Sequence, residues 1–194
     1  LNIEHPDILR FIEAKDNPEA LTNFNLSVDV TDEFMKAVEK GTDYNLVNPR
    51  TGETTDKLNA KEVFDKIVDM AWRTGDPGLV FIDEINRKNP TPELGAIEAT
   101  NPCGEQWLGP YENCCLGSVN LAEHSGPDGS IDWEGLRQSV VTSTRFLDNV
   151  VEANAYVPAV PQLKESAHRA RRIGLGIMGL ADLMYHVGVR YGSR

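Results

Sequence analysis

Helical and strand-like spacings of apolar residues alternate along this chain, and this alternation is the feature that most limits its fold. Residues 24–30 carry an apolar side chain at every second position, which is typical of a strand with one buried face. Residues 79–82 form a short apolar run that predicts a buried strand. Helical spacing follows or separates these segments. Because strands divided by helices usually pair in parallel, we expect an α/β fold with functional residues on loops at one end of the sheet.

Capping residues mark the ends of the predicted helices. Thr31 caps a helix that ends at Gly41, and Asn59 caps a second one that ends at Gly75. Asp132 begins a longer helix. The apolar residues predicted to face inward on that helix are Trp133, Leu136, Val140, Leu147 and Val151.

The stretch from Asp83 to Gln106 has little apolar periodicity. It holds five helix- or strand-breaking residues, namely Pro90, Pro92, Gly95, Pro102 and Gly104. We therefore expect a long irregular excursion there, and long irregular loops in compact domains tend to be functional.

Charge and composition exclude several classes of protein. A formal net charge of −11 argues against a surface for nucleic acid, which normally carries a basic excess. No apolar run is long enough to predict a membrane span, and no signal peptide is visible. Three cysteines are too few for a secreted disulfide framework, so we expect a reducing, cytoplasmic location. Because Leu1 is not Met and no helix stop precedes Arg194, we expect residues 1–194 to be part of a domain truncated at both ends.

The most informative stretch is Ala99–Gln106, in which a thiol lies between an amide and a carboxylate. Asn101, Cys103 and Glu105 are each two positions apart, so an extended loop would project them to the same side. They could then meet one ligand. Taken alone, the stretch fits equally well with a rigid polar loop that holds an inert cysteine.

Several motifs, in this order and at this spacing, resemble the catalytic subunits of ribonucleotide reductases. They cover nearly the whole chain, and the Asn-Pro-Cys-Gly-Glu-Gln form is most similar to the adenosylcobalamin-dependent class II enzymes. The motifs are His5–Ile8, Thr22–Asn25, Phe81–Asp83, Asn89–Pro92, Thr100–Gln106, Leu116–Leu121 and Arg171–Gly176.

The resemblance implies a fold and a chemistry. The chain would form part of a ten-stranded α/β barrel, with Cys103 at the tip of a central finger loop as the site of a transient thiyl radical. That radical abstracts the 3′-hydrogen of the ribose. Glu105 matches the carboxylate that takes the proton of the 3′-hydroxyl, and Asn101 matches the amide that holds the sugar. These roles suit their chemistry, because a carboxylate can act as a general base whereas an amide orients without titrating.

Cys114 follows Cys103 by eleven positions and matches the second, reducing thiol of the family, on the following barrel strand. In the family this thiol ends in a disulfide with a cysteine from an earlier strand, and this chain has no match for that cysteine. We interpret Cys115 as a bystander. Zinc is not expected, because the cysteines and His124 lack the spacing of a zinc site.

The resemblance also implies ligands and partners. We expect reduction of ribonucleotides, as diphosphates, with adenosylcobalamin as the radical source, although no residue of this chain is identifiable as its docking site. A deoxynucleotide or ATP effector, a thioredoxin-type reductant and a homodimer of the full-length enzyme are further implied. Two alternatives remain open: a class I large subunit that receives its radical from a metal-containing subunit, and a non-catalytic regulatory module of the same fold.

The segment from Lys15 to Asn23 matches the family loop that relays the identity of the effector to the substrate base. The residues assigned to it are Lys15, Asp16, Asn17 and Asn23. Without the resemblance, the same segment would be interpreted as a polar connection.

Gly174–Gly179 matches the Gly-x-Gly-x-x-Gly pattern of dinucleotide binding, but the context argues against that function. The pattern is informative only after a strand and before a helix, with an acidic residue about twenty positions later. Here an arginine-rich segment precedes it. We predict instead that its small residues allow close packing of a helix or loop.

Overall fold

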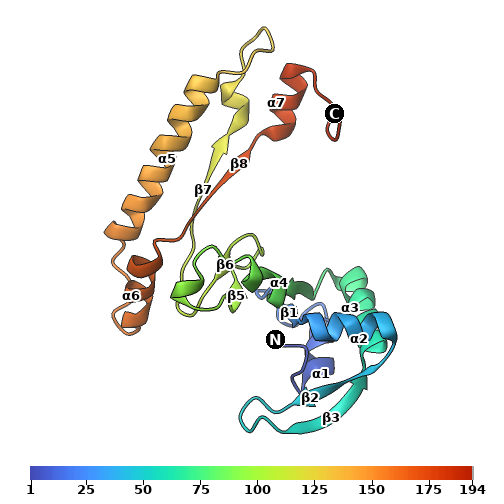
Figure 1. Cartoon of the computed structure of the whole chain (residues 1–194). Coiled ribbons are helices and arrows are strands. Elements are labelled where there is room, and N and C mark those ends of the chain that lie inside the picture. Colours follow the sequence, from blue (N-terminus) through green and yellow to red (C-terminus); the bar gives the residue numbers. More distant parts are fainter. Residues whose placement is uncertain (194) are drawn as a thin grey trace. The chain divides into compact units, whose positions relative to one another are not determined.

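A computed structural model describes residues 1–193, which divide into two compact units, Leu1–Trp107 and Leu108–Arg194 (Figure 1). The eight strands of the described chain form four two-stranded sheets. The predicted α/β class is therefore confirmed, with parallel pairing in the two longer-range sheets. Residues 1–193 do not close into a barrel, so the ten-stranded barrel remains a proposal for the full-length protein.

The first unit is built on a parallel pair, β1 with β4, in which Ser27 lies opposite Gly78 and Val30 opposite Phe81. The residues between these strands form two helices and an antiparallel hairpin (Figure 1). The elements of this unit are α1 (Ile8–Ile12), β1 (Ser27–Val30), α2 (Asp32–Lys40), β2 (Asp43–Val47), β3 (Thr54–Asn59), α3 (Ala60–Thr74), β4 (Gly78–Phe81), α4 (Ile82–Arg87), the 3-10 helix η1 (Pro92–Leu94), β5 (Ala99–Thr100) and β6 (Trp107–Leu108).

A single apolar core holds the first unit together, with Phe34 of α2 at its centre and 1% exposed. Tyr44 of β2 meets Phe34 edge to face at 4.9 Å between ring centroids, and its hydroxyl donates to the Ile3 carbonyl at 3.2 Å. The β2–β3 hairpin was not predicted. Most of its side chains are polar and exposed, so the burial of Tyr44 and Leu46 on one strand is the only apolar signal.

The predicted caps are confirmed. Thr31 Oγ1 accepts from the Phe34 amide at 3.1 Å, and Asn59 Oδ1 accepts from the Lys61 and Glu62 amides. Gly41 and Gly75 end α2 and α3 in the left-handed conformation, with φ of 64° and 86°.

The long excursion predicted from Asp83 is only partly irregular. Its first residues continue α4 as far as Arg87, so the prediction is wrong there. Arg87 stabilises this short helix through ion pairs with Glu84, one turn earlier, and with Asp32 at 2.6 Å. These ion pairs stabilise a helix that the spacing of apolar residues does not predict.

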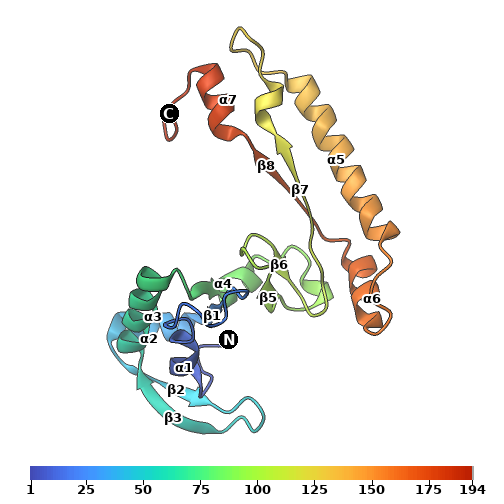
Figure 2. The ribbon, with the colours of Figure 1, turned by 180° about the vertical axis from the view of Figure 1, so that it is seen from behind.

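The second unit is a β-α-β arrangement in which β7 pairs in parallel with β8, and α5 runs alongside β7 in both views (Figure 1, Figure 2). Gly117 of β7 faces the Leu147 side chain of α5, where an added Cβ would lie in ordinary contact at 3.5 Å. The elements are β7 (Cys115–Asn120), η2 (Leu121–His124), α5 (Trp133–Ala153), α6 (Pro161–Ala170), β8 (Ile173–Met178) and α7 (Leu180–Val187).

The inward face predicted for α5 is only half correct. Leu147 and Val151 are buried, whereas Trp133 is 69% exposed and Val140 is 41% exposed. A six-residue strand spans about 20 Å and a 21-residue helix about 30 Å, so the strand pair cannot cover the whole helix.

The glycine-rich segment 174–179 is mostly strand β8, so the prediction of a helix or loop is wrong. Close packing through small residues does occur, now between strands. Gly179 has φ of 68°, and a Cβ on it would overlap the side chain of Asn120. The segment is therefore explained by backbone packing.

Candidate active-site loops

Cys103 lies in a tight turn rather than in an extended loop. The Gly104 amide donates to the Asn101 carbonyl at 3.1 Å, which closes a four-residue turn, and Gly104 has φ of 83°. Asn at the first position, Pro at the second and Gly at the fourth are the residues that such turns favour. The premise that alternate side chains project together is therefore wrong for this segment. The turn instead presents Cys103 at its corner.

Asn101 is the buried member of the group, at 8% exposed. Its Oδ1 accepts from the backbone amide of Gln106 at 3.0 Å, and its backbone amide donates to the backbone carbonyl of Gln106 at 3.1 Å. Both bonds close the base of the loop. Among residues 1–193 the structure shows no acceptor for Asn101 Nδ2, so this group can donate to a ligand.

The Cys103 and Glu105 side chains are exposed. An exposed thiol can be reached by a radical source, and an exposed carboxylate can accept a proton from a hydroxyl that approaches it. The segment thus places an amide, a thiol and a carboxylate within five consecutive residues.

A cavity of about 400 Å³ lies beside this turn, within the size range of small-molecule sites. Its lining comes from residues 98–102, from the segment before β1, and from residues of β1 and β4. Phe24 contributes an exposed ring, at 60%, to this lining. The cavity lining includes Asn23, Phe24, Asn25, Thr100, Asn101 and Pro102.

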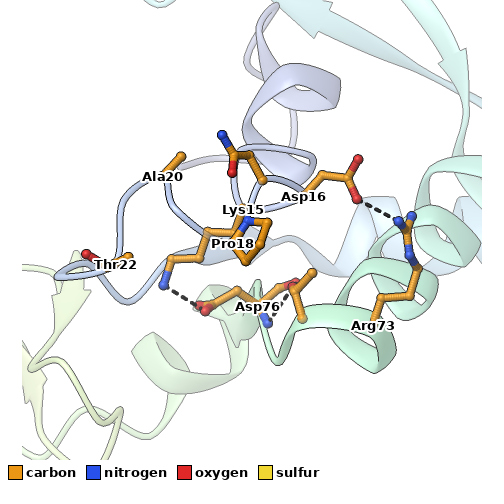
Figure 3. Close-up of a pocket in the computed structure, with 9 residues that line it drawn as sticks. Lys15, Asp16, Pro18, Ala20, Thr22, Arg73 and Asp76 are labelled. Carbon is orange, nitrogen blue, oxygen red and sulfur yellow. Dashed lines mark hydrogen bonds and ion pairs between the residues drawn. The ribbon is translucent and has the colours of Figure 1, made fainter.

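An ion pair holds the base of the Lys15–Asn23 loop. Lys15 Nζ lies 2.9 Å from Asp76 Oδ2 (Figure 3). Asp76 Oδ1 accepts from the Leu26 amide at 3.0 Å. Lys15 also donates to the Phe24 carbonyl. β1 begins only at Ser27, although apolar alternation predicted a strand from Phe24. Side chains bind the Phe24 carbonyl and the Leu26 amide, and pairing with β4 starts where the Leu26 carbonyl accepts from the Gly78 amide at 2.8 Å.

Lys15, Asp16 and Asn17 line a second cavity of about 520 Å³, together with Arg73 at the end of α3. Arg73 pairs with Asp16 at 2.7 Å, as the dashed line in Figure 3 shows. Asn23 is not with them, because it lines the cavity beside the Cys103 turn. The four residues assigned to this loop therefore divide between two cavities.

Arg73 and Asp76 were not singled out in the sequence, and Asn25 was noted only as the last residue of the Thr22–Asn25 motif. Each acts on a partner more than fifty positions away, and neither periodicity nor a local motif marks such pairs. The only sequence signal at Asp76 is the following Pro77, which indicates a turn.

Asp76 should make stability depend on pH. Burial opposes its charge, but the bonds from Lys15 and the Leu26 amide outweigh burial and hold the pKa of the Asp76 carboxyl below its ordinary value. A carboxyl group whose pKa is lower in the folded than in the unfolded protein stabilises the folded state at pH values above the unfolded-state pKa. This stabilisation is lost as the pH falls through the folded-state pKa. We expect Asp76→Asn to cost up to about 1 kcal/mol at neutral pH.

Thermal unfolding of the full-length protein, measured for wild type and Asp76→Asn across acidic and neutral pH, checks this. The two melting temperatures should differ at neutral pH and converge in acid. A constant difference at every pH would contradict the assignment.

Cys114 lies in the second unit, immediately before β7 rather than within it. Two residues earlier, Glu112 forms a buried ion pair with Arg172 at 2.9 Å and accepts from the Gly109 amide at 2.7 Å. Their side chains are 5% and 16% exposed. This pair fixes the segment that leads to Cys114. The neighbouring Cys115 makes only a weak contact, from Sγ to the Leu147 carbonyl at 3.8 Å.

No helix in residues 1–193 combines the length and apolar character needed to cross a membrane. Across the same residues, no three His, Cys, Asp or Glu side chains are grouped as metal ligands would be.

Comparison with known proteins gives similarity over the whole chain. A family model described as "Ribonucleotide reductase, barrel domain" matches residues 1–194. A Thermoplasma acidophilum protein named vitamin B12-dependent ribonucleoside-diphosphate reductase is 49% identical over 194 residues, which are 100% of this chain and 25% of the relative. A protein of the same name from Mycobacterium tuberculosis is 50% identical over 194 residues, covering 100% of this chain and 27% of the relative.

A more distant relative from Rhodopirellula baltica, named vitamin B12-dependent ribonucleotide reductase, is 33% identical over 218 residues, with 100% of this chain and 21% of the relative covered. The chain thus spans about a quarter of the length of these relatives.

Proposed function

The chain belongs to the ribonucleotide reductase barrel family, and from this we propose that the full-length protein reduces ribonucleotides to deoxyribonucleotides with Cys103 as the radical site. The observation that carries the proposal is the turn at residues 101–104, which presents the Cys103 thiol at its corner beside a cavity of about 400 Å³. The resemblance of Thr100–Gln106 to the family motif supports the choice of this thiol.

Cys103, Glu105 and Asn101 each have a distinct role in the proposed reaction. A thiyl radical on Cys103 abstracts the 3′-hydrogen of the ribose, and the carboxylate of Glu105 takes the proton of the 3′-hydroxyl. Asn101 Nδ2 donates to the sugar, while its Oδ1 keeps the loop closed. The substrate would lie in the adjoining cavity, with its sugar over the turn and its base toward Phe24 and Asn23.

The reduction needs two electrons, which a pair of thiols supplies. The 2′-hydroxyl leaves as water, and Cys114 together with a second cysteine becomes a disulfide. No other cysteine of this chain fits that second role, since Cys103 carries the radical and a disulfide between the adjacent residues Cys114 and Cys115 is sterically unfavourable. A thioredoxin-type protein would then restore the thiols.

Adenosylcobalamin is the proposed radical source, because relatives about 50% identical carry vitamin B12-dependent names. When bound, it supplies a radical through homolysis of its cobalt–carbon bond. The exposure of Cys103 fits a bulky cofactor that must approach the thiol. The same relatives support ribonucleoside diphosphates as substrates and make a radical-donating metal subunit the weaker alternative.

The remaining elements of the proposal concern regulation and assembly. Lys15, Asp16, Asn17 and Asn23 would respond to a deoxynucleotide or ATP effector bound elsewhere in the full-length protein. Their loop is suited to this role because it lies between two cavities, one of them beside the Cys103 turn. A homodimer and a cytoplasmic location complete the proposal.

The test is a reductase assay on the full-length protein with a ribonucleoside diphosphate and a dithiol. We expect turnover only when adenosylcobalamin is added. Turnover without cobalamin but with a separate metal-containing subunit would refute the cofactor assignment and leave the reductase assignment intact. No reduction under either condition would refute both.

A further inference from the structure

Asn25 joins the end of the Lys15–Asn23 loop directly to the Cys103 turn. Its Nδ2 donates to the Pro102 carbonyl at 2.6 Å, although the two residues are 77 positions apart. Pro102 lies between Asn101 and Cys103, so the bond acts on the backbone at the corner of the turn.

The backbone on both sides of Asn25 is held by one ion pair. Lys15 donates to the Phe24 carbonyl, and Asp76 accepts from the Leu26 amide at 3.0 Å. Lys15 and Asp76 are themselves paired at 2.9 Å, with side chains 15% and 20% exposed, so solvent screens this pair only in part. Because both flanking peptides are anchored, the backbone from which the Asn25 side chain extends is held in place.

We propose that Asn25 is a positioning residue that couples the Lys15–Asn23 loop to the Cys103 turn. A displacement of Lys15 moves the Phe24 carbonyl and, through Asn25, the Pro102 carbonyl. The position of the Cys103 backbone, which follows Pro102, thereby depends on the state of the loop. This inference rests on the proposed function, in which Cys103 is the radical site and the loop responds to the effector.

Asn25→Ala and Asn25→Asp in the full-length protein test the coupling. Alanine removes the donor, and aspartate keeps the shape but presents a carboxylate that cannot donate. For both variants we expect kcat to fall about fivefold to tenfold, as for loss of one hydrogen bond, with KM changed less than about twofold. Asn48→Ala is the matched control, because Asn48 is another asparagine whose side chain bonds an exposed backbone group, here the Arg50 amide, far from the turn in sequence.

A second readout does not depend on turnover. Alkylation of Cys103, followed by mass spectrometry relative to Cys115, should be at least about twofold faster in both Asn25 variants, because the turn opens more often when its tie is lost. Unchanged kcat together with unchanged alkylation would overturn the coupling. If the wild-type protein reduced no ribonucleotide, the proposed function would fail, while the alkylation comparison would still decide whether Asn25 holds the turn.

A double-mutant cycle tests the route through the ion pair. Asp76→Asn removes the charge that holds Lys15 but keeps an oxygen for the Leu26 amide. Its effect on kcat should largely disappear in the Asn25→Ala background, because the path to the turn is already cut. Fully additive effects would show that the ion pair and Asn25 act independently, and would overturn the proposed coupling.

Discussion

Cys103→Ser in the full-length protein is expected to abolish ribonucleotide reduction. We expect kcat to fall by at least about 10³-fold, which corresponds to a rise of about 4 kcal/mol in the activation free energy. Serine keeps the size of the side chain and the turn that presents it, since Gly104 and Pro102 are unchanged. It removes the chemistry, because an oxygen–hydrogen bond is too strong for the radical step. The measurement is the rate of deoxyribonucleotide formation with saturating adenosylcobalamin and dithiol.

The other two cysteines provide graded comparisons. Cys114→Ser should permit at most a compromised first turnover, because the proposed disulfide cannot form. Cys115→Ser should be nearly silent, since Cys115 makes only a 3.8 Å contact to a carbonyl and a hydroxyl can replace it. Single-turnover and steady-state assays on the three variants separate these outcomes. Substantial turnover by Cys103→Ser would show that the radical is carried elsewhere.

Local features of this fold could be predicted because their causes are local. Thr31 and Asn59 cap α2 and α3 through bonds to amides two or three positions away, so residue type and spacing suffice. The Cys103 turn could have been predicted in the same way. Asn, Pro and Gly at positions 101, 102 and 104 favour a turn over the extended loop that alternate spacing assumed.

Features that depend on distant partners could not be predicted. Lys15 and Asp76 bind the Phe24 carbonyl and the Leu26 amide just before β1, and Asp76 lies 61 positions after Lys15. The Glu112–Arg172 pair spans 60 positions. In each case, the sequence alone would place these charged residues in solvent, whereas the folded chain pairs them with partners about sixty positions away. The catalytic assignments themselves came from resemblance, and they stay predictions until the cysteine variants are assayed.

The exposed half of α5 has a related cause. Apolar spacing identifies a face that is suited to burial, but it does not say what covers that face. In the second unit one strand pair is available, and it reaches Leu147 and Val151 but not Trp133 or Val140. The sequence therefore encodes a larger apolar surface than the residues of this unit can cover.

The 194-residue chain, produced alone, should consequently be catalytically inactive, unevenly protected against amide exchange and prone to associate. The first unit has a contiguous buried core, whereas the second exposes large apolar side chains on its helices and on β8. Strand pairs with open edges and uncovered faces promote association. The most exposed apolar side chains of the second unit are Trp133, Phe146, Ile177, Tyr185 and Tyr191.

Hydrogen exchange with mass spectrometry compares two long helices within the same sample. Amides of α3, which buries Val63, Ile67 and Met70, should exchange at least about 100-fold more slowly than those of α5, a difference of about 2.7 kcal/mol in opening free energy. Light scattering should show species larger than a monomer, because the uncovered faces of the second unit can pair with one another. A monodisperse monomer in which α5 is protected as strongly as α3 would contradict this, since two buried apolar side chains on 21 residues would then suffice to hold a helix against a single strand pair.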